Sequence, residues 1–257
     1  MGTYVSLAAD EAAVSKILKS LIQDALDDMD DLAHRALLKS GGHINRAYLQ
    51  RLRTSLRNLA EEKGIEIVNG KYSDRLAAVM EKAIETVVAS VGTTVTLGEI
   101  STQLLDLALS NSEVLVQDIL DDGVKIVNEE VAASIVTGKS HADVAAAIKE
   151  RLVLGDGAEI SSARADKIAR SEVGSVYRQA QYQTGKEFGF KCYKYVGPSD
   201  DRTEPICQRY LDKVLTEDEW REIYAQETGN EDNAFRYDLH YGGRHQLVPV
   251  PCPEGKG

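Results

Sequence analysis

The chain has 257 residues, of which 43% are hydrophobic and 28% are charged, a composition typical of a folded globular protein. Its formal net charge of −11 argues against broad, non-specific binding to nucleic acid, because such binding depends on neutralising phosphates with Lys and Arg. No apolar run approaches the roughly 20 residues of a membrane-spanning helix, so no membrane partner is expected. The three cysteines do not form a disulfide framework and fit synthesis in a reducing cytoplasm.

Long helices are predicted for most of the chain, because all five prolines lie after residue 197 and an interior proline would break a helix. Apolar residues recur at three- and four-residue steps over 14–29, 49–59 and 76–91, which predicts three helices. Residues 40–43 should break the first helix, and the second should end near Gly64. Beyond them we expect a turn or short strand at 93–98 and then two helices, around 100–109 and 114–136.

A capping box predicts the start of the next helix, because the side chain of Ser140 and that of Asp143 can each bond the other's backbone N–H. Residues 155–157 hold two glycines and are expected to form a loop. A further helix should then run from about 161 to 185.

The pattern changes in the last quarter of the chain. Alternation over 190–196 predicts a strand, and a second capping box, Thr216 with Glu219, opens a short helix. Residues 247–251 are expected to be an edge strand or an extended tail, because their prolines cannot serve a central strand. The chain is therefore predicted to be mainly α, with a long-helix body over 1–160 and a small α+β module over 161–257.

The helix predicted from about 161 to 185 carries a carboxylate on its apolar face. Glu172 lies four residues after Ile168 and four before Val176, both of which belong to the apolar stripe. A buried carboxylate requires a partner, and arginine is the expected one. We interpret Glu172 as half of an ion pair that fixes this helix to the C-terminal module, with a catalytic carboxylate as the alternative.

Two polar clusters flank the short helix that Thr216 opens. Residues 200–203 follow a Gly-Pro pair and are expected on a turn, whereas two glycines permit a tight bend between His240 and His245. Zinc ligand types are present, and the candidate set is Cys207, His240, His245 and Cys252. The chain has neither a CxxC pair nor an HxxxH pair on a helix, so we expect a hydrogen-bonded polar cluster and no cofactor, with zinc as the alternative.

Three blocks of sequence carry a family resemblance: RADKIARSE at 164–172, DRTEPIC at 201–207 and HYGGRHQLVPV at 240–250. In order and spacing they resemble the C-terminal domain of phage head morphogenesis proteins, the Mu-F-like minor head proteins. Two departures weaken a metal site carried over from that family. Many relatives have a second cysteine where this chain has Tyr210, and many have a cysteine where it has Gly243.

The resemblance implies a structural minor head protein of a tailed bacteriophage, made in the host bacterial cytoplasm and carried in the virion. It implies a role in head morphogenesis at the portal vertex and in passage of DNA, with the portal or capsid protein as partner. Copies of the chain itself are a further candidate partner, because its long helices could pair with each other. We predict that the polar residues form a clasp that locks the module to the helix around Glu172. The clasp residues are Arg170, Glu172, Asp201, Arg202, Thr203, Cys207, His240, Arg244 and His245.

A local basic face is the one feature that bears on DNA. Arg46, Arg53 and Arg57 fall on one side of the helix predicted around 44–60, where they either pair with acidic side chains or contact packaged DNA or an acidic partner.

Two other functions compete with the structural one. The first is a metal-dependent hydrolase or toxin-like transferase in which Glu172, Asp201, Arg202, His240 and His245 converge. The second is a helical adaptor or internal scaffold that pairs with copies of itself. We expect no enzyme, because the sequence shows no catalytic-triad order, phosphate loop or dinucleotide fingerprint.

Overall fold

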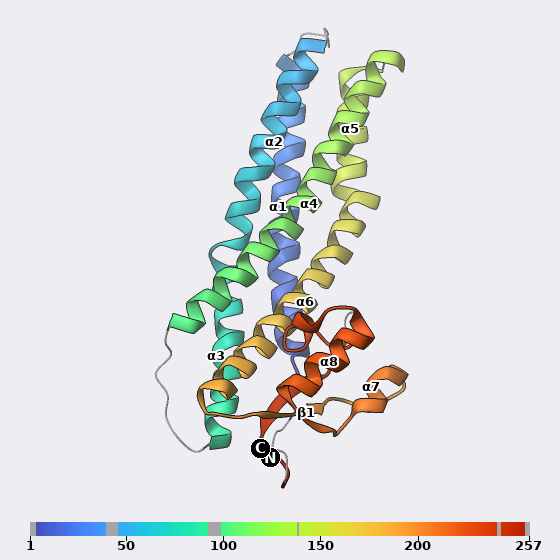
Figure 1. The fold of residues 1–257 in the computed structure, drawn as a ribbon. Coiled ribbons are helices and arrows are strands. Elements are labelled where there is room, and N and C mark those ends of the chain that lie inside the picture. Colours follow the sequence, from blue (N-terminus) through green and yellow to red (C-terminus); the bar gives the residue numbers. More distant parts are fainter. Residues whose placement is uncertain (1–3, 40–45, 92–98, 138, 241–242, 255–257) are drawn as a thin grey trace. The chain divides into compact units, whose positions relative to one another are not determined.

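The computed structural model describes residues 4–39, 46–91, 99–137, 139–240 and 243–254 (Figure 1). The helix break predicted at 40–43 and the turn or strand predicted at 93–98 lie outside these residues. Among the described helices, none combines the length and the apolar character needed to cross a bilayer. The chain forms two compact units. The first consists of Ala13–Ser73 and Leu109–Ile168, and the second of Met1–Ala12, Asp74–Ala108 and Ala169–Gly257.

Long helices make up most of the described chain, as the proline distribution predicted (Figure 1). The capping box of Ser140 and Asp143 is present at the start of α5, with both reciprocal bonds formed. The helical elements before the sheet are α1 (Ala8–Lys39), α2 (Arg46–Val68), α3 (Lys71–Val91), α4 (Glu99–Thr137), α5 (His141–Lys149), the π-helical turn η1 (Glu150–Leu154) and α6 (Asp156–Glu187).

Three helix boundaries differ from the prediction. The helix α2 continues through Gly64 to Val68, because the missing side chain leaves room for α4: a Cβ at Gly64 would lie 2.6 Å from the Gln117 side chain. The helix α4 is continuous where two helices were expected. The polar residues 110–113, which separated the two predicted helices, lie within α4. The buried Ser112 hydroxyl among them forms a 2.6 Å hydrogen bond with the hydroxyl of Tyr72. The helix α6 already begins at Asp156, inside the predicted loop.

The first unit has an aliphatic core lined by the predicted apolar stripes. From α1 it includes Val14, Leu18, Ile22, Leu26 and Met29, and α2 and α4 contribute further buried Leu, Ile and Val side chains. The helices approach closely at Gly123, where an added Cβ would lie 3.0 Å from Leu26 and 3.3 Å from Met29 and Leu152. Burial of aliphatic side chains is therefore the main stabilising contribution to this unit.

The second unit contains a small antiparallel sheet of the order β2-β1-β3. Its strands are β1 (Cys192–Val196), β2 (Val214–Thr216) and β3 (Gln246–Val250), and the connections hold α7 (Pro205–Tyr210), α8 (Glu217–Thr228) and the 3-10 turn η2 (Glu231–Asn233). The predicted edge strand is confirmed as β3, which pairs with β1 only and so tolerates its proline. The capping box of Thr216 and Glu219 is also confirmed, at the start of α8.

An aromatic core packs against this sheet. The Trp220 ring on α8 is fully buried, and its Nε1 donates a 2.8 Å hydrogen bond to the backbone oxygen of Tyr193 on β1. Tyr182 of α6 stacks on Phe235, with ring centroids 4.0 Å apart. These contacts hold α6, the sheet and α8 together as one packed module and give the polar residues described below a fixed frame.

The cysteines were not expected to form a disulfide framework, yet Cys192 and Cys252 are bonded to each other. The antiparallel register pairs Cys192 with Val250, so the chain just beyond β3 passes beside the start of β1. The Cα atoms of the two cysteines lie 5.1 Å apart, within the range that a disulfide spans. This pairing depends on the strand register, which the cysteine spacing alone does not reveal.

Candidate functional site

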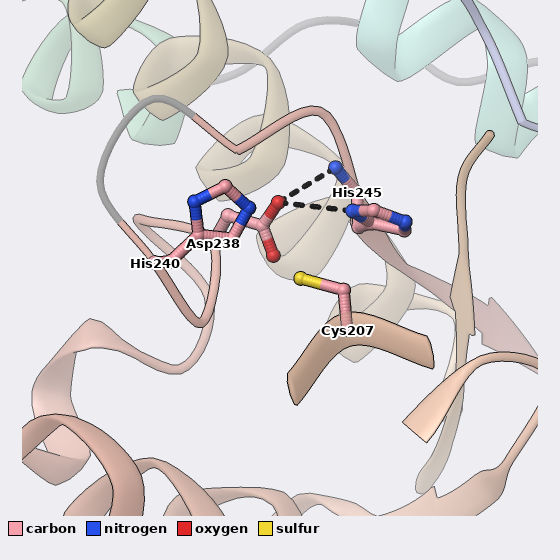
Figure 2. A group of neighbouring side chains, drawn as sticks. All are labelled: Cys207, Asp238, His240 and His245. Carbon is pink, nitrogen blue, oxygen red and sulfur yellow. Dashed lines mark hydrogen bonds and ion pairs between the residues drawn. The ribbon is translucent and has the colours of Figure 1, made fainter. Parts of the chain in front are cut away.

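Four side chains with metal-ligating atoms converge in the C-terminal module: Cys207, Asp238, His240 and His245 (Figure 2). One ligand atom from each lies within 4.8 Å of the other three. Cys207 comes from α7, Asp238 and His240 from the segment after η2, and His245 from the residue before β3. Cys207, Asp238 and His245 are buried, and His240 is half-buried.

Asp238 is the hub of this cluster. Its Oδ2 accepts hydrogen bonds from the backbone N–H of His245 at 2.8 Å and lies 3.2 Å from the His245 Nδ1 (Figure 2). Its Oδ1 accepts from the backbone N–H of Leu239 at 2.7 Å and from the hydroxyl of Tyr195. Burial acts to raise the pKa of Asp238, but the hydrogen bond with His245 and the charge of Arg178 hold that pKa below its usual value. The carboxylate is therefore stabilised in its ionised form.

Arg178 joins α6 to the loop that carries the cluster. Its Nε donates to the backbone oxygen of His245 and its Nη2 to that of Gly243, each at 2.9 Å. The side chain is only 8% exposed, so these bonds are shielded from water. They satisfy two backbone carbonyls that have no strand partner at this point and fix the position of His245 relative to α6.

The turn after β1, residues 198–203, lies beside the cluster, with the Pro198 carbonyl 3.1 Å from the His245 Nε2. The Thr203 hydroxyl donates to the Pro198 carbonyl at 2.9 Å and accepts from the Asp200 N–H at 3.0 Å. The Arg244 guanidinium binds both oxygens of Asp200, at 2.8 and 2.5 Å. This bidentate pair holds the pKa of the Asp200 carboxyl well below its usual range and closes the turn over the cluster.

Glu172 is buried on α6, as its place on the apolar stripe predicted, and is 2% exposed. Burial raises its pKa to about 7, an effect that the nearby Arg236 and a hydrogen bond with Ser171 only partly offset. One carboxylate oxygen, Oε2, has no hydrogen-bond partner. Arg236, which follows η2, is the arginine whose charge lowers the pKa of Glu172. Arg244 instead binds Asp200.

The thiol of Cys207 is fully buried in the same module. Burial, followed by the charge of Asp238, raises its pKa to about 11. The Tyr195 hydroxyl lies 3.1 Å from its sulfur. In the absence of a bound cation this sulfur therefore remains a neutral thiol at neutral pH.

The structure brings together Cys207, His240 and His245 of the predicted clasp, with Thr203 and Arg244 in the adjoining turn. The other clasp residues lie elsewhere. Arg170 is exposed and lies 4.0 Å from Glu11, and both Asp201 and Arg202 are exposed at the tip of the turn. Cys252, predicted as a candidate zinc ligand, is bonded to Cys192. Whether these residues act as a stabilising clasp stays a prediction.

Sequence reasoning missed Asp238 and Arg178. The one signal for Asp238 in the sequence was its position two residues before His240. Arg178 had no comparable signal, since its partners are backbone carbonyls. On α2, the side chains of Arg53 and Arg57 are exposed, as a solvent-facing basic surface requires, and that of Arg46 lies outside the described residues.

These features define a mainly α protein with a small α+β C-terminal module built around a buried polar cluster. Residues 125–231 match the model of the family described as phage Mu protein F like protein. This match supports a phage head morphogenesis, or minor head, protein family and a structural role related to the phage head. The match runs from α4 to the first residue of η2, so Asp238, His240 and His245 lie beyond it. No curated protein and no solved structure is significantly similar to the chain.

Proposed function

We propose that the protein is a minor structural component of the phage head that acts in assembly at the portal vertex. The match of residues 125–231 to the phage Mu protein F like family carries this proposal. The aromatic core, the disulfide and the Arg178 bonds support a role for the C-terminal module as a rigid body. The helices of the first unit would supply contacts to the portal or capsid protein, or to further copies of the chain.

Passage of DNA is the finer part of this proposal. Arg53 and Arg57 lie four residues apart on α2 and are exposed, so they are the cations that would contact packaged DNA. The net charge of −11 confines such contact to a local face. Replacing both arginines with Gln should lower DNA packaging without removing the protein from particles, whereas unchanged packaging would assign them to a solvated face.

A non-enzymatic role is part of the same proposal. Asp201 and Arg202, two of the residues that a hydrolase or transferase would bring together, are exposed, whereas Cys207, Asp238 and His245 are buried. Synthesis in the host cytoplasm before incorporation into the virion is also proposed.

Quantitative mass spectrometry of purified procapsids and virions tests the proposal, with the major capsid protein as the internal standard. We expect the protein at a few copies per particle in both, and chemical cross-links from it to the portal protein. Absence from both kinds of particle would overturn the structural role. Presence in procapsids but loss from virions would instead assign it as an internal scaffold.

A further inference from the structure

We propose that Cys207, Asp238, His240 and His245 bind one zinc ion in a closed, structural site. This site is independent of where the protein sits in the particle. Its ligand set differs from the one expected from sequence. Cys252 is bonded to Cys192 and is not a ligand, and Asp238 is the fourth ligand instead.

The hydrogen bonds of the His245 ring provide the first argument. Its Nε2 lies 3.1 Å from the Pro198 carbonyl, which can only accept, so Nε2 carries a proton. In the neutral imidazole, Nδ1 then presents a lone pair to the Asp238 Oδ2, 3.2 Å away. Two lone pairs facing each other at this distance repel, so a proton or a metal ion must lie between them. A backbone carbonyl that fixes the far nitrogen is the usual partner of a metal-ligating histidine.

The two remaining side chains favour the metal ion over the proton. A proton between Asp238 and His245 requires only those two residues, yet the Cys207 sulfur and a His240 ring nitrogen also lie within 4.8 Å of both. In Figure 2 the Cys207 sulfur points toward the Asp238 carboxylate, and the His240 ring lies beside it. In a tetrahedral zinc site with one sulfur ligand, the ligand atoms are roughly 3.3–3.5 Å apart, given Zn–N of about 2.0 Å and Zn–S of about 2.3 Å. Binding therefore requires the most widely separated ligand atoms to approach each other by up to about 1.5 Å.

Charge and ligand type identify the metal. One thiolate and one carboxylate with two neutral imidazoles carry two negative charges, which a divalent cation cancels in a site where net charge is costly. Sulfur and imidazole ligands favour zinc over magnesium or calcium, which prefer oxygen. Four protein ligands complete a tetrahedron and leave no position for water or substrate, which is the form of a structural zinc site.

The backbone at Gly243 is shaped around the Asp238 carboxylate. A Cβ at position 243 would overlap the Asp238 Oδ2, so only glycine allows this oxygen to occupy its place. Asp238 thus fills the space that a side chain at 243 would take. The site would join α7, the segment after η2 and the start of β3, which are otherwise held together by hydrogen bonds and the aromatic core.

Metal content of the full-length chain tests the proposal directly. The purified protein is loaded with zinc sulfate, dialysed and analysed by mass spectrometry of the metal. We expect about one zinc ion per chain, a lower melting temperature after chelation, and a thiolate-to-metal charge-transfer band when cobalt(II) replaces zinc. A cooperatively folded wild-type chain that retains no zinc, or that gives no such band with cobalt, would overturn the site.

Variants locate the metal. Cys207→Ser and Asp238→Asn should each lose bound zinc, while His34→Ala, which removes an exposed histidine on α1, should keep it. His240→Gln, at the half-buried position, serves as the ligand variant least disruptive to packing and should also lose zinc. Equal zinc in the wild type and in all three ligand variants would show that the metal binds elsewhere and would refute the proposal.

Discussion

The burial of Glu172 makes the stability of the C-terminal module depend on pH. Its pKa is about 7 in the folded chain, against 4.5 for an exposed glutamate, because burial penalises the charged form. Between these values the folded state keeps a proton that the unfolded state has released. The free energy of unfolding therefore falls as pH rises from about 4.5 to about 7 and levels off above that.

The size of this effect follows from the two pKa values. At 1.36 kcal/mol per pKa unit, the full difference corresponds to roughly 3 kcal/mol, of which roughly 2–3 kcal/mol should appear between pH 5 and pH 8. Glu172→Gln removes the titration and keeps the shape of the side chain. Near pH 5 the variant and the wild type should be similar in stability, and at pH 8 the variant should be more stable by that amount.

Urea unfolding followed by Trp220 fluorescence measures the free energy of unfolding of the unit that contains Glu172. Trp220 is the sole tryptophan and belongs to the same compact unit as Glu172. Subtracting the variant's pH profile from that of the wild type cancels every other titrating group. Glu62→Gln, at an exposed site on α2, is the matched control and should run parallel to the wild type. Parallel profiles for Glu172→Gln as well would refute the argument from burial.

Three further changes probe the same module. Arg178→Met should cost about 3 kcal/mol or more in unfolding free energy, because it leaves two shielded carbonyls without donors; a loss below 1 kcal/mol in urea unfolding would contradict that role. Peptide mapping without reductant should find Cys192 joined to Cys252, whereas free thiols at both positions would contradict the pairing. Replacing both cysteines with Ser should lower the free energy of unfolding by about 4 kcal/mol, because the disulfide closes a loop of 60 residues. Trp220→Phe should lower the melting temperature, since it removes the bond to the Tyr193 carbonyl, and an unchanged melt would show that this bond contributes little.

Features set by neighbours in sequence were predictable. Both capping boxes, Ser140 with Asp143 and Thr216 with Glu219, form because their bonds span only three residues. The edge position of β3 followed from its proline, whose missing N–H excludes a central strand. Glu172 was correctly placed in the interior, because a helical period determines which face of α6 it occupies.

Features set by tertiary packing were not predictable. Glycine often ends a helix, but Gly64 lies inside α2 and permits the close approach of α4. No local sequence pattern reveals that contact. The disulfide required the register of β1 and β3, and the charge that lowers the pKa of Glu172 comes from Arg236, which no local pattern singled out. Asp238 entered the polar cluster because the loop after η2 folds back on α7, a path that depends on the whole module.

The most direct test of a portal-vertex role is an asymmetric reconstruction of the head from purified procapsids. We predict density at the portal vertex into which the sheet β2-β1-β3 fits together with α7 and α8. The cluster of Cys207, Asp238, His240 and His245 should lie inside that density, away from the portal contact. Density for this module on the capsid lattice or the tail, with none at the portal, would contradict the role.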